Sequence, residues 1–190
     1  MKKYLCLALL FISSAAMAFS EAELVQMLQK PENVQGNFVQ QRFLKSLVKP
    51  ITTSGQFSLV KNKGLLWQMQ KPFVSRLKVS SEGIQQWNGV YWVNSQKFGQ
   101  SEQIALFLNL LTGDVSGLSQ HFEIILTGTE KQWRLKLLPR TLIMKQIFQS
   151  IQLQGDHLVK EIELSEVQGD RTLIQFSQLK INQPLVDFTQ

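Results

Sequence analysis

From residue 36 onward, apolar and polar side chains alternate along most of the chain. A period of two indicates β-strands that turn one face toward a core. Gly, Pro, Asn and Asp interrupt the alternation at intervals typical of short turns. We therefore expect about ten strands, at residues 36–43, 55–59, 65–69, 73–79, 90–93, 121–127, 133–138, 148–154, 158–167 and 172–181, with a further short strand that follows the turn at Ser81-Glu82-Gly83 and ends at Trp87. Asn88-Gly89 predicts a tight hairpin turn of type I′ between two of them.

Two segments follow a helical period instead. Ser20 and Glu23 form a capping-box pattern, which predicts a helix over residues 21–30. In residues 101–111, apolar side chains recur at the i, i+3, i+4, i+7 spacing of an amphipathic helix. Its stripe consists of Ile104, Phe107, Leu108 and Leu111. Residues 140–146 fit either a short helix or a loop.

This order of elements predicts a mostly β fold with some α-helix. A meander of so many strands favours an antiparallel, strongly curved sheet with helices on one side. Residues 19–190 are of a length that suits a single domain.

One face of the predicted sheet is rich in large apolar side chains. A filled core between sheet and helices is the simpler interpretation, because periodicity does not distinguish a filled core from a hollow one. The curvature favours a cavity, since wide barrels enclose ligand space. The candidate cavity residues are Phe57, Leu59, Leu65, Trp67, Met69, Leu77, Val79 and Trp87.

The N-terminus has the features of a secretory signal. Lys2 and Lys3 precede a short apolar run, and Ala16-Met17-Ala18 matches a cleavage site. A membrane anchor is the alternative, but the run is far shorter than the roughly 20 residues that cross a bilayer. We expect residues 1–18 to be removed after Ala18 and the protein to be exported. The sole cysteine, Cys6, would leave with them.

Composition and charge limit the functions that the sequence supports. The net charge of +6 includes both signal-peptide lysines, and the remaining cations are scattered. This pattern suits an anionic lipid or an acidic partner and gives no support for nucleic-acid binding. His121 and His157 lack a second metal ligand at a recognised spacing, and no catalytic motif occurs. We therefore expect no enzyme activity, no metal and no cofactor.

Several short motifs, in order along the chain, together resemble the LolA family of periplasmic carriers of outer-membrane lipoproteins. No single motif is specific; their order and spacing carry the resemblance. They are Gly36–Gln40, Ser54–Phe57, Leu65–Trp67 followed by Lys71-Pro72, Ser81–Gly83 with Trp87, 110–114 with Phe122, and 182–185.

The resemblance implies an unclosed (half) β-barrel whose concave hydrophobic face is covered by helices. It implies that this cavity shields lipoprotein acyl chains in the periplasm, without a cofactor. It also implies an inner-membrane transporter as donor and an outer-membrane receptor as acceptor. The helix of residues 101–111 would be the lid, and we expect a monomer.

One departure from the family keeps a second interpretation open. Where the best-known carriers have an arginine that holds the lid shut, alignment on Trp67 places Lys61, and Leu65 stands at a family phenylalanine. Lysine offers a point charge and not a planar fork. The alternative is therefore a LolA-like paralogue that carries another lipid or acyl cargo for a dedicated biosynthetic or export locus. A structural envelope protein with a filled core is a third hypothesis.

Overall fold

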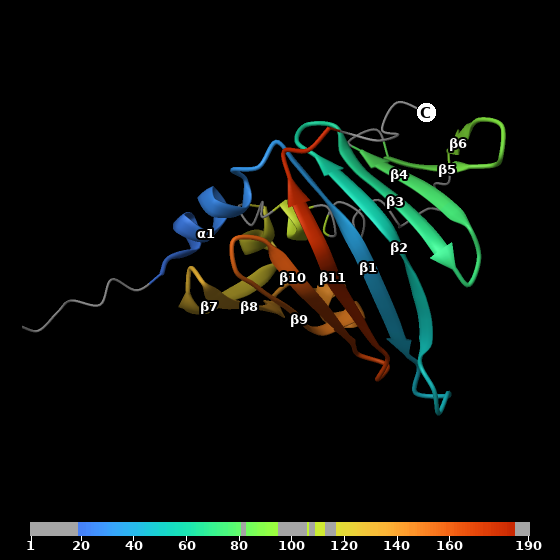
Figure 1. Ribbon diagram of the computed structural model, residues 1–190. Helices are drawn as coiled ribbons and strands as arrows, with labels where there is room; N and C mark the ends of the chain where they lie inside the picture. The colour runs from blue at the N-terminus through green and yellow to red at the C-terminus, as the bar shows by residue number, and fades with distance from the viewer. Residues whose placement is uncertain (1–18, 81–82, 95–105, 107–108, 113–116, 185–190) are drawn as a thin grey trace, which may run out of the picture.

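The computed structural model describes residues 19–80, 83–94, 106, 109–112 and 117–184. These residues form one curved, unclosed sheet of 11 antiparallel strands with a few helices (Figure 1). The strand order is β6-β5-β4-β3-β2-β1-β11-β10-β9-β8-β7. Two meanders are thus joined at the centre, where the first and last strands pair. The predicted fold class is confirmed.

The strands agree with the sequence pattern to within a few residues. Their bounds are β1 Asn33–Phe43, β2 Ile51–Val60, β3 Gly64–Lys71, β4 Ser75–Ser80, β5 Gly83–Trp87, β6 Trp92–Asn94, β7 Phe122–Thr129, β8 Gln132–Pro139, β9 Phe148–Gly155, β10 Val159–Glu166 and β11 Arg171–Ile181.

The helices are short. Helix α1 (Glu21–Leu28) begins with the predicted capping box, in which the Ser20 hydroxyl accepts from the Glu23 backbone N–H and the Glu23 carboxylate accepts from the Ser20 backbone N–H. The ambiguous segment contains helix α3 (Leu142–Ile147), and a 3₁₀ turn, η1 (Leu118–Gln120), precedes β7. Among the described residues, no helix is long and apolar enough to cross a bilayer.

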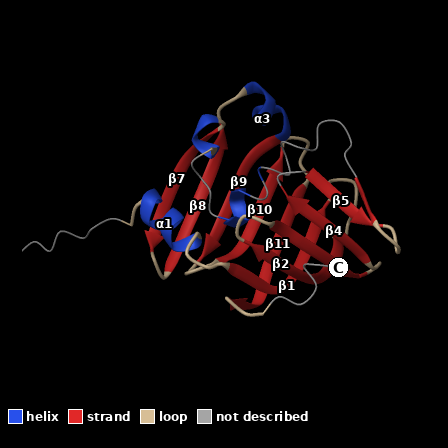
Figure 2. Cartoon of the chain, turned by 90° about the horizontal axis from the view of Figure 1, so that it is seen from above, coloured by secondary structure: helices blue, strands red, loops and turns tan. Residues whose placement is uncertain are grey.

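The core lies on one face of the sheet, which we call the inner face. Strand register places most of the buried side chains on this face, for example Leu135 opposite Leu153 and Phe38 opposite Phe176, whereas Leu66 is buried on the other face of β3. Leu24 of α1 and Met144 of α3 belong to the same core cluster. Figure 2 shows α1 beside β7 and β8, with α3 at the opposite end of β8 and β9.

Two expectations from the sequence need comment. The predicted two-residue turn at Asn88-Gly89 is wrong: Trp87 pairs with Trp92, so four residues connect β5 to β6. The Asn88 side-chain oxygen accepts the backbone N–H groups of Val90 and Tyr91, which stabilises the longer loop. The predicted signal peptide, residues 1–18, lies outside the described residues.

Candidate functional site

Seven of the eight predicted cavity residues share the inner face. Register pairs Phe57 with Trp67 and Leu59 with Leu65 between β2 and β3, and it continues to β4. Their burial is uneven. The side chains near the β2–β3 turn are buried, and those farther along β3 and β4 are half-buried. The buried ones are Phe57, Leu59, Leu65 and Val79, and the half-buried ones are Trp67, Met69 and Leu77.

Four aromatic rings form the centre of this face. Phe38 stacks on Trp67 with ring centroids 3.6 Å apart, and Phe176 meets Phe57 edge-on at 5.1 Å. Trp67 and Phe176 are also edge-to-face, at 6.4 Å. Phe38 and Phe176 were not among the predicted site residues, although both lie in predicted strands. They come together through the pairing of β1 with β11, which places residues far apart in sequence side by side.

Gly36 makes room for this cluster. It pairs with Phe57 across β1 and β2, and a Cβ atom at Gly36 would lie 3.2 Å from Phe57 Cε1 and 2.6 Å from Leu179 Cδ2. A glycine in a strand often marks such a close approach. The first motif of the family resemblance, Gly36–Gln40, therefore has a physical role: its glycine accommodates one aromatic ring and its Phe38 supplies another.

The structure corrects the eighth residue, Trp87. Val79 pairs with Ile84 and Lys78 with Gln85, so Trp87 shares the face of Lys78, opposite the inner face. There it meets Trp92 edge-on with centroids 5.4 Å apart, and Lys78 Nζ lies 4.7 Å above the Trp92 ring. In β5 it is Ile84, and not Trp87, that lies on the inner face, where it packs against the core.

A cavity of about 260 Å³ opens onto the core at one end of the inner face. Its walls include Leu28 of α1, Leu59, and Thr112 from the helical residues 109–112. Lys61 also lines it, with its Nζ 3.4 Å from Glu32 Oε1. The volume is just below the roughly 300–1,000 Å³ of typical ligand pockets. The rest of the wall is mixed, with polar Gln29, Asn33 and Asn62 beside apolar Pro31 and Val34.

The predicted lid is only partly described. Ile104, Phe107 and Leu108 lie outside the described residues. Leu111 is buried in the core cluster, and so are Leu106 and Leu110, which the predicted stripe omitted. Leu106 and Leu110 are four residues apart, a helical spacing that the sequence also contains.

A larger depression, of about 610 Å³, lies elsewhere, at the β7–β8 and β9–β10 turns. Lys131, Arg134 and Lys160 line it, and Lys160 pairs with Asp156 at 3.5 Å. Charged walls of this kind do not suit an acyl chain. The apolar inner face is therefore the better candidate site despite its smaller cavity.

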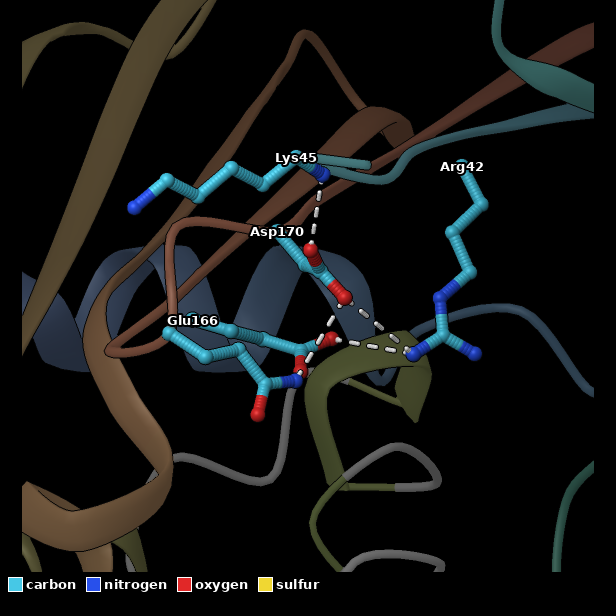
Figure 3. A network of polar contacts seen from close by, with 5 residues as sticks. Arg42, Lys45, Glu166 and Asp170 are labelled. Carbon is cyan, nitrogen blue, oxygen red and sulfur yellow. Dashed lines mark hydrogen bonds and ion pairs between the residues drawn. The ribbon is translucent and has the colours of Figure 1, made fainter. Parts of the chain in front are cut away.

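Polar side chains appear on the inner face toward the β1–β2 turn. Arg42 Nη2 lies 3.8 Å from Glu166 Oε1 and 3.9 Å from Asp170 Oδ2, and the backbone N–H of Lys45 donates to Asp170 Oδ1 at 3.0 Å (Figure 3). These contacts join β1 to the β10–β11 turn. The apolar band therefore ends at an ionic network on this side.

The middle of the inner face is formed mainly by aromatic and aliphatic side chains. Gln40 and Thr53, which pair across β1 and β2, are polar side chains beside them on the same face. Within the described ranges, no group of three His, Cys, Asp or Glu side chains lies close enough to hold a metal ion. Such a surface binds by excluding water from apolar groups.

The chain is similar to known carrier proteins. A family model described as outer membrane lipoprotein carrier protein LolA matches residues 29–188. A protein of Pseudomonas putida (strain GB-1) named outer-membrane lipoprotein carrier protein is 29% identical over 171 residues, which is 86% of this chain and 79% of that one. A protein of the same name from Pseudomonas fluorescens is 26% identical over 183 residues, 94% and 86% of the two chains. A solved LolA superfamily protein from Nitrosomonas europaea has a TM-score of 0.49 at 10% identity, covering 90% of this chain and 96% of that chain.

Proposed function

The chain belongs to the LolA family of outer membrane lipoprotein carrier proteins, and from this premise we propose that it shields the acyl chains of lipoproteins during their transfer between membranes. The resemblance drawn from the sequence motifs is thereby confirmed at the level of the family. The cargo and the route are our proposal.

The observation that carries the proposal is the uncharged aromatic band on the inner face. Phe38, Phe57, Trp67 and Phe176 form a continuous apolar wall. Each methylene of an acyl chain buried there contributes about 0.8 kcal/mol. A contact with several methylenes is therefore enough to hold lipid out of water.

A carrier must also release its cargo. Trp67, Met69 and Leu77 are only half-buried, so this part of the wall already keeps some contact with solvent. We propose that cargo enters here, and that residues 101–111 act as the lid which lifts to admit it. Lys61 would assist the closed state from the edge of the small cavity, where Thr112 also lies.

The proposed setting is the periplasm. The signal-like residues 1–18 and the family's role both support export. In that compartment an inner-membrane transporter would supply the lipoprotein and an outer-membrane receptor would accept it. The cavity then needs neither a cofactor nor a catalytic group, because no bond of the cargo is broken.

A second cargo class is supported by one contact. Lys61 is engaged with Glu32, at the loop between α1 and β1, and lysine lacks the planar fork of arginine. A lid held differently from that of the best-known carriers would suit a paralogue that carries another lipid or acyl compound. Mass spectrometry of lipid that copurifies with the protein separates the two candidates.

The test of the carrier proposal is titration of the mature protein with a fluorescent fatty-acyl probe, with a palmitoylated peptide as competitor. We expect saturable binding that Trp67→Glu abolishes, because an unpaired carboxylate in an apolar site is strongly disfavoured. Trp87→Glu is the matched control: it changes the same residue type, also half-buried, on the opposite face.

Comparing the two variants shows which face of the sheet binds the probe. If Trp87→Glu lowers probe binding as much as Trp67→Glu does, the probe does not bind the inner face. If folded wild-type protein shows no saturable binding at all, the carrier proposal is wrong and the apolar face is an ordinary core.

A further inference from the structure

Exposed apolar side chains gather at one end of the sheet. In an antiparallel meander, alternate connections lie at the same end, so the β1–β2, β3–β4, β8–β9 and β10–β11 connections share one end. Each of them presents large apolar side chains to solvent. We call this set the apolar rim; its members are Leu47, Val48, Phe73, Val74, Leu142, Ile143 and Val167.

These large apolar side chains are strongly exposed to solvent. Val48 is 102% exposed, Val74 82%, Leu142 79% and Phe73 75%. At the opposite end, the described turns 61–63, 130–131 and 156–158 expose no large apolar side chain, and only Ile181 at the end of β11 does so. Single exposed apolar residues are normal, but a concentration at one place marks an interaction surface.

Hydrogen bonds hold neighbouring parts of the rim together. The backbone N–H of Val167 donates to the Ile147 carbonyl at 3.1 Å, which ties the β10–β11 turn to α3. The Arg42–Asp170 contact and the Lys45–Asp170 hydrogen bond tie the same turn to the β1–β2 connection (Figure 3). These contacts connect the β8–β9, β10–β11 and β1–β2 parts of the rim. The β5–β6 loop also exposes Val90 and Tyr91, but Figure 1 shows it carried away from the β1–β2 turn by the twist of the sheet.

The charge of the rim is positive. Its connections carry Lys45, Lys49, Arg140 and Lys145, and Lys71 ends the strand before Phe73. The acidic side chain of these connections, Asp170, is engaged by Arg42, as is Glu166 at the end of β10. Apolar side chains mixed with lysines form the pattern that binds the interface of anionic membranes.

We propose that the apolar rim docks this protein onto the surface of a bilayer that contains anionic phospholipid. The apolar side chains lie on projecting turns and on a short helix, so they can enter the headgroup region, and the lysines lie beside them to meet phosphate groups. This proposal does not rest on lipid carriage by the inner face. Membrane docking and acyl binding are separate properties of the chain.

The test is flotation of the mature protein with vesicles of phosphatidylethanolamine and phosphatidylglycerol, beside vesicles of phosphatidylcholine alone. We expect binding to the anionic vesicles that falls as salt rises. The double variant Val48→Glu, Phe73→Glu should bind about tenfold or more weakly, and Lys45→Gln, Lys49→Gln should lose mainly the preference for anionic vesicles. Ile181→Glu, an exposed apolar position at the other end, is the matched control and should bind like the wild type.

Acyl-probe binding and circular dichroism of each variant separate docking from folding and from cargo binding. A rim variant that loads the probe normally but no longer floats supports the proposal. Leu142→Glu in α3 provides a second rim variant if the double variant does not fold. The proposal is overturned if wild-type protein does not float, or if the double variant and Ile181→Glu float equally. A change of oligomeric state in the double variant would also overturn it and would make the rim a contact between copies of the chain.

Discussion

The two halves of the inner face are packed differently. In β8–β10, six inward side chains are almost completely excluded from water; they are Trp133, Leu135, Leu137, Ile151, Leu153 and Ile162, each at most 2% exposed. In β3 and β4, Trp67, Met69 and Leu77 are half-buried, although they are equally apolar and equally inward in register. We call the first set the filled half and the second the open half.

This difference bears on the choice between a filled core and a cavity, which the sequence left open. The filled half is an ordinary core: helix α1 contributes Leu24, and the Trp133 indole N–H donates to the Asp156 carbonyl. The open half keeps apolar surface in partial contact with water, which lowers stability. Partly exposed apolar surface of this kind is what the proposed binding wall requires.

The largest expected effect comes from Leu137→Ala in the filled half. Leu137 is 0% exposed, so truncation leaves a cavity, and the free energy of unfolding should fall by about 3 kcal/mol. Met69→Ala in the open half should cost about 1 kcal/mol or less, because the wild-type side chain is already partly solvated. Urea denaturation of both variants measures the two losses. Equal losses would show that the two halves do not differ as described.

A bound acyl ligand should narrow the difference between the halves. At a free concentration one hundred times its Kd, a ligand that binds only the folded state adds about 2.7 kcal/mol to the free energy of unfolding. We expect this gain in wild type and in Leu137→Ala, because the filled half does not touch the ligand. Trp67→Glu should show no gain. Thermal or urea unfolding with and without a soluble acyl ligand measures it, and a gain in Trp67→Glu would place the ligand elsewhere.

The strands were predictable because each strand's alternation and each turn's composition are local properties. The face of Trp87 was not predicted, because it depends on the turn before it. Ser80 pairs with Gly83, so odd-numbered residues of β4 pair with even-numbered residues of β5. Val79 and Trp87 therefore lie on opposite faces although both numbers are odd. A strand's own alternation does not contain this information; the length of the connecting turn does.

The candidate site was predictable only in part, for a similar reason. Residues close in sequence, such as Leu65 and Trp67, were assigned to the inner face correctly. Phe176 was missed because it reaches Phe57 only through the pairing of β11 with β1. The half-burial of Trp67 could not be predicted from the sequence either, since alternation identifies a face but not how closely other elements approach it.

A smaller effect is expected where the two halves meet. Arg42 in β1 contacts Glu166 at the end of β10 and Asp170 in the turn that follows, but its side chain is 46% exposed. Solvent screening limits such pairs, so Arg42→Ala should cost only about 0.5 kcal/mol. A double-mutant cycle of Arg42→Ala and Asp170→Asn separates the Arg42–Asp170 ion pair from the Lys45 hydrogen bond to Asp170. The coupling free energy between Arg42 and Asp170 should shrink at high salt. A coupling that salt leaves unchanged would contradict a surface ion pair.

The smallest effect concerns α1, whose capping box lies one turn before Leu24 of the filled half. The backbone N–H of Ser20, and secondly its hydroxyl, donate to the Glu23 carboxylate and hold its pKa below the usual value of a glutamate. A lowered folded-state pKa means that the stabilisation is present above the unfolded pKa and is lost as the pH falls through the folded pKa.

Glu23→Gln should therefore slightly reduce the fall in the free energy of unfolding on the acid side, an effect smaller than the loss in Arg42→Ala. Probe binding at neutral pH should be unchanged. Urea midpoints at neutral and acidic pH, beside Glu21→Gln as a control on the same helix, measure this slope. If Glu23→Gln weakens probe binding as much as it weakens stability, α1 is coupled to the open half. The separation between a filled support and an open wall would then be smaller than the packing indicates.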